Sequence, residues 1–298
     1  MMSANRILAT VFVVTVWGIA VALWPTSVRG QGSPTSRPAS GPASRPASQP
    51  GKELALDLGN SVTMRLVLIP GGKFMMGSPD SEKGRDSDEG PQHEVAISKS
   101  FYLGIYAVTQ GQWKAVMGTE PWKKEAGVRE GVDFPVTFVS WDDAAEFCKR
   151  ASQKAGMTVR LPTEAEREYA CRAGTKTRFY YGDDLDYAKL GDNAWYIKNA
   201  PQAREGYAHA AGQKKPNDWG LYDMHGNVWG WCSDWYGEKY YANSDKTDPR
   251  GPGSGTLRVV RGGSWLSSPQ DCRSALRHGY EPDVRTSVVG FRVCVDSK

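Results

Sequence analysis

The half of the chain that follows Gly174 limits the possible folds more than any other feature. It is dense in glycine, tryptophan, tyrosine and asparagine, and the full sequence of 298 residues carries 33 Gly and 11 Trp. Glycine and asparagine favour turns, so the strand-like segments between them are too short to build a long regular sheet. The aromatic residues supply enough apolar surface for one sizeable core. The sequence therefore predicts an α+β domain with low regular secondary structure.

Earlier segments show clearer periodic patterns. Residues 62–69 are rich in β-branched side chains and are a predicted strand. A second helix-forming stretch is predicted to run from Thr163, where Glu166 completes a capping box, to a stop at Gly174. Before it, a first helix is predicted to follow Ser140 as its N-cap. Apolar side chains recur on one face of that helix: Ala144, Phe147, Cys148 and Ala151.

The N-terminal residues have the composition of an export signal. Arg6 precedes an apolar run from Ile7 to Trp24, whose length lies between a long signal-peptide core and a short membrane span. Residues 1–30 are therefore predicted to be a signal peptide or a membrane anchor. Either one places the rest of the chain in an extracytoplasmic location, whether secreted, periplasmic or membrane-anchored.

Residues 31–51 form a Pro/Ala/Ser-rich segment. It holds three tandem copies of a tetrapeptide ending in Pro-Ala-Ser, between residues 37 and 48. Frequent proline without large apolar side chains cannot build a core, so this segment is predicted to be a disordered linker. No second linker of this kind follows. Residues 52–298 are therefore predicted to form one domain.

Composition argues against several function classes. The formal net charge is +4, and basic and acidic residues are interspersed, which is typical of a solvated surface and does not favour nucleic-acid binding. The four histidines show no metal-ligand spacing. The acidic residues Asp86, Asp88 and Glu89 are compatible with a cation site or with a solvated loop. Five cysteines in an exported chain allow disulfides, and their odd number leaves at least one thiol without a partner in the chain.

A series of short motifs occurs in one order along the chain. They include Phe74-Met-Met-Gly77, Arg160-Leu-Pro-Thr-Glu-Ala-Glu166, Lys215-Pro-Asn217, Ser233-Asp-Trp235, Arg261-Gly-Gly-Ser-Trp265 and Gly290-Phe-Arg292. Together they resemble the sulfatase-modifying factor family, also known as the formylglycine-generating enzyme family. The resemblance covers about residues 62–294. It implies the α+β fold of that family, which is related to the C-type-lectin-like fold.

The resemblance also implies where catalysis would occur. Enzymes of this family oxidise a cysteine of a client sulfatase to formylglycine with dioxygen and copper(I), which two thiolates hold because soft sulfur ligands select Cu(I). The two positions correspond to Ser267 and Cys272 in this chain, and Ser264 belongs to an intact Gly-Gly-Ser-Trp frame. Cys272 and Ser264 are therefore the candidate catalytic residues. Serine offers a hard, protonated oxygen, so copper is not expected to bind with Cys272 alone.

Calcium and a disulfide are further implications of the resemblance. One calcium site of the family would map to Asn193, Ala194, Glu205 and Tyr207, whose oxygens suit a hard cation. A second would map to Asp223, Gly226, Val228 and Gly230, where glycine replaces the expected final carboxylate. Cys148 and Cys294 resemble a disulfide pair of the family. Cys294 stands one residue later than the resemblance implies, which in a strand would turn it to the other face.

Two functions follow from the sequence. The absent first cysteine and the proline-rich linker favour an exported, non-catalytic family member that binds a protein, peptide or glycan, or that has a structural role in the cell envelope. The alternative is a copper-dependent oxidase that generates formylglycine in sulfatases. Cys272, Ser264 and the intact frame around them support this second reading.

Calcium binding can be tested through stability. If Asn193 and Glu205 donate ligands, a chelator should lower the melting temperature, because an ion bound only to the folded state stabilises it by mass action. At 100-fold saturation the effect would be about 2.7 kcal/mol. Glu205→Ala should abolish the response in a thermal melt. A parent protein that melts at the same temperature with and without chelator would eliminate the site.

Overall fold

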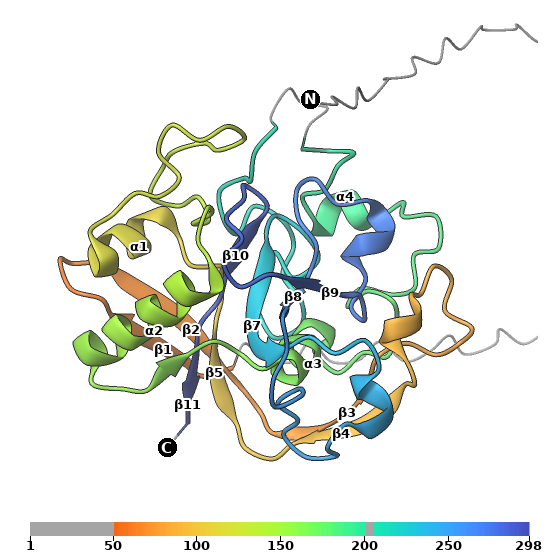
Figure 1. The fold of residues 1–298 in the computed structure, drawn as a ribbon. Coiled ribbons are helices and arrows are strands. Elements are labelled where there is room, and N and C mark those ends of the chain that lie inside the picture. Colours follow the sequence, from red (N-terminus) through yellow and green to blue (C-terminus); the bar gives the residue numbers. More distant parts are fainter. Residues whose placement is uncertain (1–50, 201–205, 298) are drawn as a thin grey trace, which may run out of the picture. The chain divides into compact units, whose positions relative to one another are not determined.

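The computed structural model describes residues 51–200 and 206–297 (Figure 1). Residues 1–50 lie outside this part of the chain, and with them the predicted signal peptide or anchor and nearly all of the predicted linker. Within the described residues, no helix is both long and apolar enough to cross a membrane. Short helices and short strands alternate with long irregular connections, which confirms the predicted α+β class with low regular secondary structure.

The largest sheet has five antiparallel strands and brings both ends of the described chain together (Figure 1). In spatial order its strands are β1 (Glu53–Asp57), β2 (Thr63–Ile69), β5 (Phe101–Gly104), β11 (Cys294–Asp296) and β6 (Val159–Arg160). The last strand in sequence therefore lies between β5 and β6. The strand predicted over residues 62–69 is confirmed as β2.

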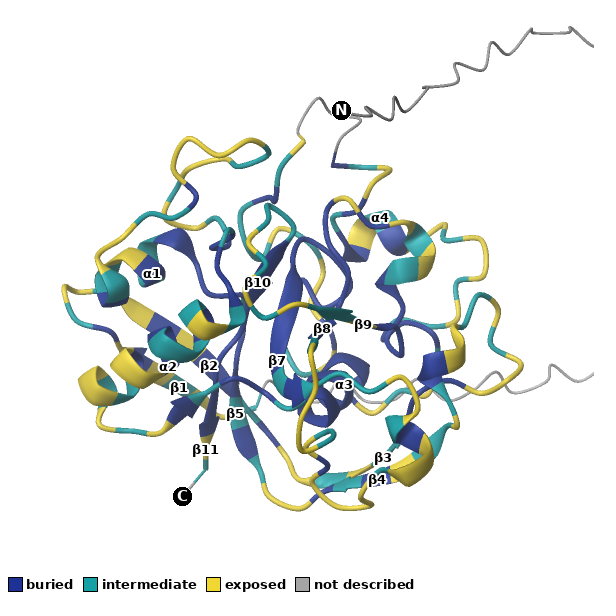
Figure 2. Ribbon diagram, in the orientation of Figure 1, coloured by how far each residue is buried: buried dark blue, intermediate teal, exposed yellow. Residues whose placement is uncertain are grey.

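A second sheet carries most of the aromatic core. Its strands lie in the order β10 (Val289–Phe291), β7 (Trp229–Trp235), β8 (Arg258–Arg261) and β9 (Arg277–Tyr280), and only the pair β10 and β7 is parallel. Strand β7 is almost wholly buried (Figure 2). A separate hairpin pairs β3 (Gly72–Met76) with β4 (His93–Ile97).

The helices begin where the sequence predicts. The described residues also form α1 (Gln110–Met117), the single turn α4 (Leu190–Asn193) and the 3-10 turns η1 (Ser87–Glu89), η3 (Tyr240–Asn243) and η4 (Pro269–Cys272). Helix α2 (Trp141–Ala155) is capped by Ser140, whose Oγ accepts from the backbone N–H of Asp143 at 3.1 Å. Helix α3 (Glu164–Arg172) has the predicted capping box. It ends slightly before the predicted stop at Gly174, because Ala173 already adopts the left-handed conformation (φ 45°).

The five-stranded sheet separates two core clusters. On one face, the apolar stripe of α2 packs with Leu66, Val159 and Val295. On the other face, Leu103 and Cys294 join a cluster that includes α3. Leu103 and Cys294 are cross-strand partners, so their side chains share a face. One face of the sheet thus packs against the cluster that contains α2 and α1, and the other against the cluster that contains α3.

This separation bears on the expected disulfide. Cys148 on α2 belongs to the first cluster and Cys294 to the second, so β11 directs the Cys294 thiol away from α2. Both residues are buried free thiols in the structure. The shift of one residue noted in the sequence agrees with this placement, because successive side chains of a strand point to opposite faces. The Cys148–Cys294 disulfide remains a prediction, and the structure does not contain it.

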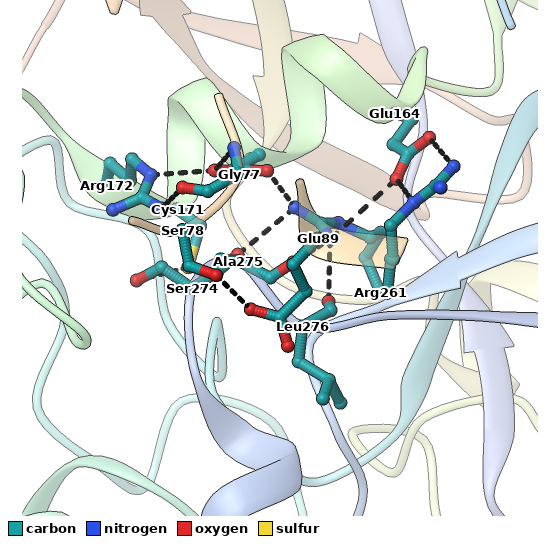
Figure 3. Close-up of polar contacts among 12 residues, drawn as sticks. Gly77, Ser78, Glu89, Glu164, Cys171, Arg172, Arg261, Ser274, Ala275 and Leu276 are labelled. Carbon is teal, nitrogen blue, oxygen red and sulfur yellow. Dashed lines mark hydrogen bonds and ion pairs between the residues drawn. The ribbon is translucent and has the colours of Figure 1, made fainter. Parts of the chain in front are cut away.

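Helix α3 meets the second sheet through buried charges rather than through an apolar stripe (Figure 3). Glu168 accepts from the backbone N–H of Gly77 at 3.0 Å and from Arg172 Nε at 2.8 Å. Its other oxygen forms an ion pair with Arg261 on β8. These side chains are at most 2% exposed. A buried charge is tolerated only when it is paired and hydrogen-bonded, so these contacts fix the helix, the β3 hairpin and β8 in one arrangement.

A second carboxylate of α3 makes the same kind of link. Glu164 accepts from Arg277 of β9 through both Nε and a terminal nitrogen, each at 2.7 Å. Burial alone would raise the pKa of Glu164, but Arg277 and Arg261 together hold it below its ordinary value. At the start of the helix, the buried carboxylate of Asp234 accepts from the backbone N–H of Glu164 at 3.0 Å. Burial, and then the nearby charge of Glu164, raises the pKa of Asp234 to about 7.

The ion network can be tested at Glu168. We expect Glu168→Gln to lower the free energy of unfolding by about 3–5 kcal/mol, because it leaves Arg172 and Arg261 buried without this carboxylate. Glu146→Gln is the control: it breaks an exposed pair with Arg150 and should lower the free energy of unfolding far less. Urea unfolding followed by circular dichroism measures both. Equal small effects would show that the network does not hold the fold.

Asp234 should give the protein a specific pH dependence. Its folded pKa lies above the unfolded value, so its contribution to stability is fully present below pH 3.8 and is lost as the pH rises through about 7. Asp234→Asn cannot ionise and should become more stable relative to the parent over that range, by on the order of 1.4 kcal/mol per unit of pKa shift. Unfolding at several pH values measures the difference. Asp186→Asn, which removes an exposed carboxylate, controls for surface charge. A constant difference between Asp234→Asn and the parent would refute the assignment.

Candidate functional site

A groove of about 330 Å³ lies on the face of the second sheet that points away from α3. Gly230, Cys232 and Asp234 alternate toward α3 along β7, so Trp229 and Trp231 point to the opposite face. The groove is lined by residues of the sheet, of the segment 264–271 and of the loop before η1: Trp229, Leu276, Arg277, His278, Tyr280, Val288, Ser264, Leu266, Ser267, Asp271 and Asp86.

Two glycines shape the turn that carries the candidate residue Ser264. Gly262 and Gly263 follow β8 with φ values of 99° and 75°, a region that favours glycine. A side chain at Gly263 would also meet Cys272 Sγ at 3.1 Å and the carbonyl of Asp271 at 3.2 Å. The Gly-Gly pair therefore lets the backbone turn sharply and pack against η4, and the turn delivers Ser264 to the groove.

The structure brings Ser264 and Ser267 together. The Ser267 hydroxyl accepts from the backbone N–H of Ser264 at 2.9 Å, and the two hydroxyl oxygens lie 3.1 Å apart. Both residues are buried and line the groove. Ser267 thus stands where the resemblance would have a metal-binding thiolate, and its oxygen instead closes a local turn.

Cys272 is not brought into the groove. It is fully buried among Phe179, Leu190 and Tyr196, and its thiol donates to the carbonyl of Ser268 at 3.5 Å. Burial, and then the charge of Asp271, raises the pKa of this thiol far above its ordinary value. Only the thiolate is a nucleophile or a strong metal ligand. Cys272 is therefore a packed thiol in this structure.

The residues present do not fit copper(I). Cys171 and Cys232 are also buried, and burial raises the pKa of each thiol. A site of the family type needs two thiolates, and here its two positions hold one protonated thiol and one engaged hydroxyl. This donor set cannot hold a soft monovalent cation.

A buried cysteine and histidine also lie together, without forming a catalytic pair. Cys171 Sγ is 3.7 Å from His225 Nδ1. His225 Nε2 accepts from the backbone N–H of Tyr180 at 3.0 Å, so the ring proton resides on Nδ1 and that nitrogen cannot take a proton from the thiol. Burial lowers the pKa of His225 to about 3. Both side chains are part of the core.

The calcium ligands are only partly described. Asn193 is buried, and its side-chain oxygen lies 3.3 Å from the hydroxyl of Tyr180. The carbonyl of Ala194 already accepts from Asn199 at 2.8 Å. Tyr207 accepts from Arg129 through its hydroxyl. Glu205 lies outside the described residues, so the site remains a prediction. Among the residues that are described, no group of three or more His, Cys, Asp or Glu could hold a metal ion.

A buried cation lies beside one residue of the second mapped calcium position. A side chain at Gly230 would meet Arg167 Nε at 3.8 Å. Arg167 is buried, and this Nε has no hydrogen-bond partner among the described residues. Asp223, on the same mapped site, has one unpartnered oxygen, and burial raises the pKa of its carboxyl. A guanidinium beside position 230 would repel a divalent cation there.

Sequence reasoning missed most of the groove. The sequence does not mark His278 and Tyr280 as groove residues, because no local pattern distinguishes two side chains of a four-residue strand. The three acidic residues before and within η1 have two different placements. Asp88 and Glu89 are buried and accept from Tyr236 and Arg273, whereas Asp86 is exposed and lines the groove. Asp86 therefore forms part of the groove wall, a position that its acidic sequence context does not reveal.

Comparison with known families gives one match along almost the whole folded region. The model of the "Sulfatase-modifying factor enzyme 1-like domain" matches residues 58–297. A formylglycine-generating enzyme of Streptomyces coelicolor is 32% identical over 286 residues, which cover 78% of this chain and 89% of the relative. An inactive C-alpha-formylglycine-generating enzyme 2 of Bos taurus is 30% identical over 295 residues, which cover 80% and 90%.

Solved structures give the same result for the fold. PvdO from Pseudomonas aeruginosa superimposes with a TM-score of 0.74 and 28% identity, covering 84% of this chain and 100% of that one. The variable protein 1 of Treponema denticola gives a TM-score of 0.72 and 29% identity, covering 82% and 99%. These likenesses confirm the fold expected from the sequence motifs.

Proposed function

The chain belongs to the sulfatase-modifying factor enzyme 1-like domain family, and we propose that it is an exported, non-catalytic member whose groove binds a partner. Family membership by itself does not decide between catalysis and binding. Formylglycine-generating enzymes and a relative named as inactive match this chain at nearly the same identity. The chemistry of the groove is therefore the deciding evidence.

One observation carries the proposal. The two positions at which the family would hold its metal are a hydroxyl engaged with Ser264 and a thiol buried outside the groove. Neither Ser267 nor Cys272 can act as a thiolate there. Other described lining groups offer aromatic rings, two carboxylates and hydroxyls, which bind ligands but supply no redox centre.

The rest of the groove suits binding. It is concave and mixes apolar walls with a few polar groups, as ligand sites generally do. The export of the domain rests on the apolar N-terminal run and the proline-rich linker, which would hold it outside the cytoplasm at a distance from a membrane or wall. The partner class is a protein, peptide or glycan, and a structural role in the cell envelope is consistent with the same surface.

A conversion assay tests the proposal. A Cys-x-Pro-x-Arg peptide incubated with the protein, copper and oxygen should keep its thiol mass in mass spectrometry. We expect a rate at least about 10³-fold below that of the Streptomyces coelicolor enzyme, since removing one member of a catalytic unit removes nearly the whole effect. Ser267→Cys should not restore conversion, because Cys272 would still point away from the groove.

One result would contradict the non-catalytic role. Copper-dependent conversion that disappears in Cys272→Ala would establish the oxidase and overturn the non-catalytic role. Circular dichroism of each variant confirms that the fold is retained, so that a loss of turnover cannot be confused with unfolding.

A further inference from the structure

We propose that this chain has lost the second calcium site that the family resemblance implies, and that the buried guanidinium of Arg167 holds the loop 222–230 in place of the metal. The proposal is independent of the groove's binding role, because Arg167 belongs to α3, on the other side of β7. It depends on the oxygens at the mapped positions, on the space that two glycines leave for the guanidinium, and on the contacts that the guanidinium makes.

The mapped positions offer few free oxygens. Calcium takes about six to eight oxygen ligands. Asp223 supplies the one carboxylate of the set, and one of its oxygens already accepts from the backbone N–H of Gly212 at 2.8 Å. The carbonyl of Gly226 accepts from the backbone N–H of Val228 at 2.9 Å. Gly230 has no side chain to complete the set. These residues therefore do not fit a calcium ion.

Arg167 reaches the space that the absent side chain of Gly230 leaves. A Cβ built on Gly230 would stand 3.8 Å from Arg167 Nε and would meet no closer atom. A Cβ built on Gly262 would stand 2.6 Å from Nη2 of the same guanidinium, which is too close for both to keep their places. Two glycines thus make room for the guanidinium. A metal-binding side chain at position 230 would start beside this cation.

The guanidinium of Arg167 binds the loop through a carbonyl oxygen. Arg167 is 3% exposed, and its Nη2 donates to the carbonyl of Met224 at 3.4 Å. Within residues 51–200 and 206–297, Nε has no hydrogen-bond partner and no carboxylate forms an ion pair with Arg167. A charge at this depth depends on the polar groups around it. The contact with Met224 therefore ties α3 to the loop.

A second buried arginine binds the start of the same loop. Arg292 donates through Nη2 to the carbonyl of Tyr222 and, at 3.3 Å, to that of Asp223. Its Nη1 donates to carbonyls at the end of β5. Three successive carbonyls of the loop, those of Tyr222, Asp223 and Met224, thus accept from guanidinium groups. A divalent cation among them would be repelled, because the chain already supplies positive charge there.

Calcium sensitivity tests the loss of the site. Glu205→Ala removes a ligand of the first mapped position, so it isolates any response of the second. The full-length Glu205→Ala protein should melt at the same temperature in excess calcium and in chelator, because an ion that does not bind cannot stabilise the folded state. A rise of the melting temperature with calcium that Asp223→Asn removes would overturn the proposal, since Asp223 supplies the carboxylate of the second position.

Hydrogen exchange tests the role of the guanidinium. Arg167→Met keeps a long side chain but removes the charge and the N–H donors. Peptides that cover residues 222–230 should exchange about tenfold faster in this variant, as expected for the loss of one hydrogen bond to a charged group. Arg160→Met is the matched control. The side chain of Arg160 contacts Glu166, Asp296 and Leu161, so its removal should leave exchange in the loop unchanged.

Two results of the exchange experiment would contradict the role of Arg167. They are unchanged exchange of the loop in Arg167→Met, and an equal acceleration in Arg160→Met. Thermal melts show whether each variant folds. The calcium experiment leaves Arg167 in place, so it decides the proposal even where Arg167→Met does not fold. The non-catalytic role is tested separately, by whether a cysteine peptide is oxidised.

Discussion

Glutamates of α3 enter the buried interface between this helix and the second sheet, and the structure depends on how their charges are paired. Glu168 binds Arg172 and Arg261, and Glu164 binds Arg277. An unpaired carboxylate or guanidinium at this depth would be strongly unfavourable, so each pairing fixes the position of a strand as well as of a side chain. Apolar packing alone would tolerate small shifts between the helix and the sheet; these directional contacts do not.

The groove is a consequence of the same pairing. Arg277 is at once the partner of Glu164 and part of the groove wall, so the helix on one face of the sheet fixes the surface on the other. Arg273 contacts Glu89 with a nitrogen–oxygen distance of 2.8 Å and thereby joins η4 to η1. Asp271 lies close to Arg273 in the sequence, and Asp86 lies close to Glu89. Their approach across the groove therefore follows from an ion pair that neither of them makes.

The frame of the family and its chemistry are separable in this chain. The Gly-Gly turn, the Ser264 position and the strands around them are present. The chain as a whole is similar to formylglycine-generating enzymes and to a relative named as inactive. The difference that the sequence resemblance implies is small: an oxygen at Ser267 where a sulfur is expected. At the second expected position, the thiol of Cys272 packs in the core. A scaffold held by buried ion pairs can lose its metal ligands without losing its shape, because those ligands do not carry the fold.

The sequence by itself determined the features that are encoded within a few residues: the caps at Ser140 and Thr163, the strand β2, the α+β class, and the family through its ordered motifs. Short-range hydrogen bonds and side-chain periodicity involve residues that are close in sequence, so the sequence alone predicts them. Tertiary structure alone decided that Cys272 turns into the core and that Asp86 and Asp271 line the same groove. These outcomes depend on which distant strands pair and where buried charges find partners, and no local pattern of residues carries that information.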